Sequence, residues 1–122
     1  MDSEEKLKQQ VTEVAKRFFA EHMSMKPESI VVDIHSDCLV IALEKVIPRA
    51  ETAYIQDASS QDRLERFYKG TYDASKLVFE AALDKVSPQR VAGSLMSIHP
   101  ALGKCVIIVS ICSDNAKKAQ LN

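Results

Sequence analysis

Residues 104–112 constrain the fold of this chain more than any other segment. They read KCVIIVSIC; in a strand, the odd-numbered residues from 105 to 111 are all apolar and share one face. Val106 and Ile108 make the opposite face largely apolar as well. A strand with two apolar faces needs cover on both. We therefore expect it inside a sheet, or covered by a second subunit, and the second arrangement favours a dimer.

Two β-hairpins are predicted. Residues 29–35 alternate between apolar and polar side chains, and residues 39–43 form a second apolar run after a short turn-prone link. Residues 90–98 and 104–112 are the second pair, and the loop 99–103 between them contains a proline and a glycine. Both pairs are therefore expected to be antiparallel.

In two other segments the apolar residues recur at helical spacing. Residues 3–23 carry an amphipathic stripe, and residues 61–86 carry a wide apolar stripe that predicts the longest helix. Gly70, inside the long helix, marks either a bend or a close approach of another backbone. Pro48 suits the first turn of a short helix over residues 49–55.

These elements describe one α+β domain over residues 1–112, followed by a polar C-terminal tail at 113–122. The hairpins are expected to join into a four-stranded antiparallel sheet, with the N-terminal and long central helices covering one face. The order of the strands is left open by the sequence.

Composition excludes several classes of protein. The chain has 122 residues and a net charge of −1, which argues against a nucleic-acid-binding surface. The charged N-terminus does not resemble a signal peptide, so we expect a cytoplasmic protein. No apolar run approaches the roughly 20 residues of a transmembrane helix.

Several segments resemble the MpsC-like family of small bacterial domains. They are residues 25–34 (MKPESIVVDI), 37–43 (DCLVIAL), 47–51 (IPRAE) and 97–99 (SIH). The family is named after a component of a cation-translocating, membrane-potential-generating system. The resemblance therefore implies an accessory role, and it brings no settled catalytic activity. It also aligns Glu51 with a helix-start glutamate, where the side chain would cap the helix or contact a ligand or partner.

Asp33, His35 and Asp37 lie at the tip of the first hairpin, and His99 lies at the second. If the tips meet, these side chains are of the types that bind divalent metals or transfer protons. If the tips do not meet, they are ordinary exposed turn residues, which is the favoured interpretation.

Tyr68 and Tyr72 are four residues apart on the long helix. A ring with a polar tip suits either the margin of the core or a groove for a partner, and the core is favoured. Cys38, Cys105 and Cys112 are isolated and lie in apolar stretches, which favours buried thiols over a metal site or a nucleophile.

No phosphate-binding loop, dinucleotide motif or nucleophile elbow is present in the sequence. We therefore expect a non-enzymatic interaction or regulatory module without a cofactor or metal. It would be homodimeric through a sheet face or the long helix, and accessory to a membrane transport or signalling system. The alternatives are a small-ligand or metal sensor at the hairpin tips and, less favoured, a small thiol enzyme.

Overall fold

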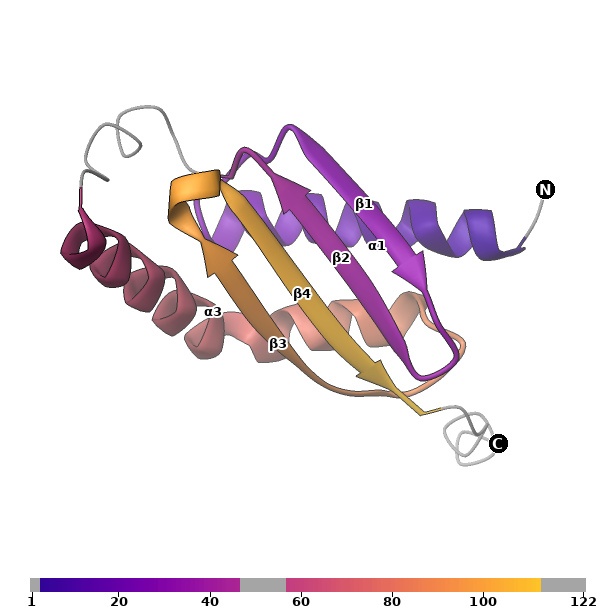
Figure 1. The fold of residues 1–122 in the computed structure, drawn as a ribbon. Coiled ribbons are helices and arrows are strands. Elements are labelled where there is room, and N and C mark those ends of the chain that lie inside the picture. The colour runs from indigo at the N-terminus through magenta and orange to yellow at the C-terminus, as the bar shows by residue number, and fades with distance from the viewer. Residues whose placement is uncertain (1–2, 47–56, 113–122) are drawn as a thin grey trace.

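The structure is a computed structural model that describes residues 3–46 and 57–112 (Figure 1). Its elements are α1 (Ser3–His22), β1 (Ser29–Ile34), β2 (Cys38–Glu44), α3 (Ala58–Val86), β3 (Val91–His99), the 3₁₀ turn η1 (Pro100–Leu102) and β4 (Lys104–Ile111). The α+β class, the two hairpins and the order of these elements are confirmed. The expected helix at 49–55 and the tail at 113–122 lie outside the described residues.

The four strands form one antiparallel sheet in the order β1-β2-β4-β3. The doubly apolar strand β4 thus lies inside the sheet, as its sequence predicts. Ile107 of β4 is opposite Ile41 of β2 and Met96 of β3, and all three side chains are buried. Both helices lie on one side of the sheet, and no helix of the described chain covers the other side (Figure 1).

Aromatic rings join the two helices inside the core. Phe18 of α1 stacks on Phe79 of α3 with ring centroids 4.7 Å apart, and it meets Tyr72 edge-on at 6.0 Å. Buried apolar side chains of α1, the sheet and α3 surround these rings: Val11, Ala15, Phe19, Leu39, Ile41, Leu43, Leu83, Cys105, Ile107 and Val109.

Local capping sets the ends of the helices. Asp57 precedes α3, and its carboxylate accepts a hydrogen bond from the Ser60 backbone N–H at 2.8 Å, so α3 begins at Ala58, earlier than the apolar stripe alone predicts. Helix α1 ends where Ser24 adopts a positive φ of 54° and the Met25 N–H donates to the Phe19 carbonyl.

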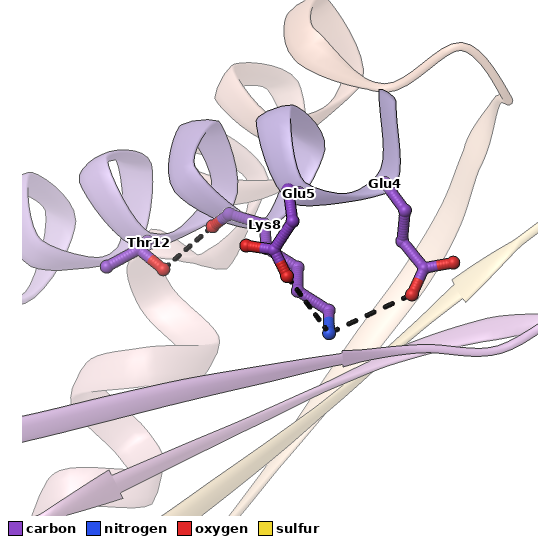
Figure 2. A network of polar contacts seen from close by, with 4 residues as sticks. All are labelled: Glu4, Glu5, Lys8 and Thr12. Carbon is purple, nitrogen blue, oxygen red and sulfur yellow. Dashed lines mark hydrogen bonds and ion pairs between the residues drawn. The ribbon is translucent and has the colours of Figure 1, made fainter. Parts of the chain in front are cut away.

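The first turns of α1 are held by local polar contacts (Figure 2). Lys8 Nζ lies 3.8 Å from Glu4 Oε1 and 4.0 Å from Glu5 Oε1, and Thr12 Oγ1 donates to the Lys8 carbonyl at 2.7 Å. Exposed helical ion pairs contribute about 0.3–0.5 kcal/mol each. These contacts therefore stabilise the start of the helix and do not form a binding site.

A half-buried hydrogen-bond chain fixes α3 to the edge strand β3. The Tyr72 hydroxyl lies 2.6 Å from Ser94 Oγ, and Ser94 Oγ donates to Glu80 Oε2 at 2.5 Å. Because the Ser94 proton is directed at Glu80, Tyr72 donates its proton to Ser94. Burial, the largest effect, raises the pKa of Tyr72 to about 12, so the phenol stays protonated and remains a donor.

Replacing Ser94 by alanine should leave the fully buried Tyr72 hydroxyl without its acceptor. We expect Ser94→Ala to lower the free energy of unfolding by about 1–3 kcal/mol in urea denaturation. The double variant with Tyr72→Phe should lose less than the sum of the two single losses, because both partners are removed together. Ser97→Ala, on the exposed side of the same strand, is the matched control. If the loss of unfolding free energy in the double variant equals the sum of the two single losses, the proposed coupling between Tyr72 and Ser94 is contradicted.

Stability should also depend on pH through Asp57, since the hydrogen bonds from Ser60 lower the pKa of its carboxyl in the folded chain. A lowered folded pKa means that the stabilisation is present above the unfolded pKa of about 3.9 and is lost as pH falls through the folded value. Asp57→Ala should therefore lower the Tm at pH 7, and the difference from wild type should shrink below pH 4. Asp57→Asn should keep the cap without this titration, and Asp73→Ala serves as the control. A Tm difference that is the same at pH 7 and pH 3 would show that the cap does not titrate.

Candidate interaction surfaces

The two hairpin tips lie at opposite ends of the sheet (Figure 1). Cys38, at the first tip, is in register with Ser110, whereas Glu44 at the other end of β2 is in register with Lys104, the partner of His99. Six residues of strand, about 20 Å, separate these ends. The side chains Asp33, His35, Asp37 and His99 therefore do not form one site.

All four of these side chains are exposed; Asp33 and His99 lie in β1 and β3, whereas His35 and Asp37 lie in the turn between β1 and β2. Among the described residues, no group of three or more His, Cys, Asp or Glu is placed to hold a metal ion. The separation of the tips thus removes the geometric basis for the ligand- or metal-sensing alternative. Glu51, the remaining acidic candidate, lies outside the described residues.

Tyr68 and Tyr72 face the core. Tyr72 is fully buried and Tyr68 is 4% exposed. The neighbouring Phe67 is 62% exposed, and its ring contacts Tyr68 edge-on at 5.3 Å. In this part of α3 the exposed aromatic ring is therefore that of Phe67, which the spacing of the two tyrosines does not indicate.

The side of the sheet away from the helices carries an apolar surface, which we call the open face. Residues paired across neighbouring strands form rows on this face. In one row, Val40 of β2 and Leu95 of β3 lie on either side of Ile108 of β4. Val31, Leu95 and Ile108 are 53%, 59% and 40% exposed. The apolar side chains of the open face are Val31, Val40, Ala42, Leu95, Val106 and Ile108.

Charged side chains of both signs lie at the margin of the open face. Lys104 Nζ is 3.9 Å from Glu44 Oε1 at one end, and Asp33 lies in the row of Val40 and Ile108 on the edge strand. A surface with an apolar centre and a mixed polar rim is typical of protein–protein interfaces.

A second apolar surface lies on α3 and in the groove between α3 and α1. Leu77 and Val78 are 75% and 53% exposed. Val78 also lines the groove, which has a volume of about 480 Å³ and contains apolar side chains from both helices, including Val14 and Ala82. This surface is on the helical side of the molecule, whereas the open face is on the other side of the sheet.

Cys38 and Cys105 are not placed as nucleophiles. Cys105 is fully buried, and burial raises the pKa of its thiol to about 12. Desolvation, and then the negative charge of Asp37, raise the pKa of the Cys38 thiol. Both environments disfavour the thiolate at neutral pH, and the thiolate is the reactive form.

Alkylation of the native protein at pH 8 should therefore leave Cys105 unmodified, and Cys38 should react more slowly than a free cysteine. Asp37→Asn should accelerate the modification of Cys38, because removal of the carboxylate charge lowers the thiol pKa. Peptide mapping by mass spectrometry measures both rates, and Asp33→Asn is the matched control. Rapid labelling of Cys105 in the folded chain would contradict this description.

A protein family matches most of the chain. The family described as "Na+-translocating membrane potential-generating system (MpsC)" matches residues 3–113. No curated protein and no solved structure matches the chain. Within residues 3–46 and 57–112, neither helix is long and apolar enough to cross a membrane. The match covers nearly the whole sequence and confirms the resemblance: the chain belongs to the MpsC family.

Proposed function

We propose that this protein is a non-enzymatic, cytoplasmic accessory or regulatory subunit of a membrane sodium-translocating system, and that it works as a homodimer. The family description supplies the link to such a system. The observation that carries the binding role is the open face, where apolar side chains of β1, β3 and β4 stay exposed and those of β2 are half-buried. An exposed apolar sheet of this kind marks a docking surface.

The open face is large enough for a specific contact. Four strands spaced about 4.8 Å apart, with about seven residues each at about 3.4 Å per residue, give a face of roughly 19 by 24 Å. Covering it would bury about 1,000 Å² in total, which is the lower limit for a specific protein–protein interface. We therefore expect a regulated, reversible complex.

The surface also indicates the chemistry of its partner. Its centre is aliphatic, and its described rim carries both Glu44 and Lys104, so it favours neither a strongly basic nor a strongly acidic partner. We propose that a flat apolar segment of another protein of the sodium-translocating system binds there.

A substitution at the centre of the open face tests this function. Ile108→Arg places a charge between Val40 and Leu95, while the opposite face of β4 keeps its core contacts. In a strain that lacks the gene, wild type should restore the sodium-dependent membrane potential, and Ile108→Arg should reduce the restored part at least tenfold. A potential-sensitive dye measures the result.

Ala20→Arg, an exposed position on α1, is the matched control and should restore the potential fully. Far-UV circular dichroism and Tm of each purified variant separate loss of binding from loss of folding. Full restoration of the potential by a folded Ile108→Arg variant would contradict the proposed role of the open face.

A further inference from the structure

The exposed side of α3 carries a continuous apolar band, which we call the outer stripe. Its members recur at spacings of three and four residues, so they share one face of the helix. They are Phe67, Gly70, Thr71, Ala74, Leu77, Val78 and Ala81. Phe67, Leu77 and Val78 are each more than half exposed.

The outer stripe has no cover within the described chain. The residues that α3 buries in the core, Tyr72, Phe79 and Leu83, lie on the other side of the helix. A Cβ atom at Gly70 would meet no atom within 4 Å. This glycine is thus not required by packing within the chain, although it lies inside a 29-residue helix where glycine costs about 1 kcal/mol relative to alanine.

We propose that the outer stripe is the interface of the homodimer, in which α3 packs antiparallel against α3 of a second copy around a two-fold axis at Ala74. In such a pair, a residue k positions before Ala74 lies opposite the residue k positions after it in the partner. Phe67 then faces Ala81, Gly70 faces Val78, and Thr71 faces Leu77.

Each of these pairings joins a large side chain to a smaller one. Helix axes in contact are about 8–10 Å apart, and small residues at the centre favour the short end of this range. With Cα atoms about 2.3 Å from each axis, helix axes about 9 Å apart would place the two Ala74 Cα atoms about 4–5 Å apart. The same arrangement places Phe67 of one protomer beside the groove that Val78 and Ala82 line in its partner.

Cationic residues limit the outer stripe at both ends. None of its residues is charged, and the first cationic residues beyond it in the same direction are Arg63 and Lys85, each eleven positions from Ala74. In the antiparallel pair these two like charges face each other, so they limit the contact to about 21 Å of helix. Together with the groove, a contact of this length approaches the lower limit of a specific interface, so we expect a dimer of micromolar affinity.

This assignment rests on the homodimer of the proposed function. It adds which surface of α3 forms the dimer and which residues of the two helices face each other. Because the outer stripe lies on the helical side, the dimer would keep both open faces uncovered, on its two outer sides. Each dimer would then present two docking surfaces to the membrane system, and two sites on one particle raise the effective affinity for a partner that is itself paired.

A charge-rescue experiment tests the register. Gly70→Glu and Val78→Lys each place an unpaired charge in the proposed interface, and each single variant should weaken dimerisation of the full chain at least tenfold. In the double variant every Glu at position 70 faces a Lys at position 78 of the partner, so dimerisation should return to within a few-fold of wild type. Within one chain the two positions are about 12 Å apart along the helix and cannot pair.

Sedimentation equilibrium from 1 to 200 µM measures these affinities, and Ala20→Glu is the control, with wild-type association expected. A monomeric wild type throughout this range would overturn the homodimer itself. Single variants that dimerise like wild type would overturn the outer stripe as its surface, and a double variant without rescue would overturn the register. Each of these outcomes is independent of the Ile108→Arg result, because Ile108 lies on the opposite side of the sheet.

A cysteine cross-link provides a second measurement of the axis. In a Cys38→Ser, Cys112→Ser background, Ala74→Cys should form a disulfide-linked dimer under mild oxidation, since the expected Cα separation is within disulfide range. Ala20→Cys should stay monomeric on a non-reducing gel. Equal cross-linking of the two variants would contradict an axis at Ala74.

Discussion

The rest of the structure depends on the burial of β4 between β2 and β3. Ile107 packs at the centre of the core, and the same strand exposes Ile108 on the other side of the sheet. Two helices are enough to cover one face of four strands, and the described chain has no further helix for the second face. The open face is therefore apolar because β4 carries apolar residues on both faces and only one face is covered.

The long helix α3 also has more apolar surface than the core covers. Its apolar residues extend around more of the helix than the core can cover, so one side carries the buried Tyr72 and Phe79 and the other carries the exposed Phe67 and Leu77. The chain from Tyr72 through Ser94 to Glu80 fixes the rotation of α3 against β3, and with it the direction in which the exposed side points. A polar contact inside the molecule thus helps to determine which apolar side chains are left for a partner.

Much of the fold was predictable because the spacing of apolar residues within a segment determines the secondary structure of that segment. Alternation predicted the hairpins, helical spacing predicted both helices, and the doubly apolar run predicted an interior strand. The candidate site was less predictable. His35 and Asp37 lie in the turn of the first hairpin and Asp33 lies in β1 beside it, but whether that tip meets His99 depends on how the hairpins join. The antiparallel pairing of β2 with β4 sends the tips to opposite ends of the sheet.

The sequence by itself determined the class of fold, the interior place of β4 and the family, since each depends on the order and spacing of apolar residues along the chain. Only the tertiary structure decided which apolar residues are covered. Phe67 and Phe79 both belong to the apolar stripe of one helix, yet one is exposed and the other fully buried. Periodicity gives the relative positions of residues around a helix, and only packing against other elements gives the direction in which they face.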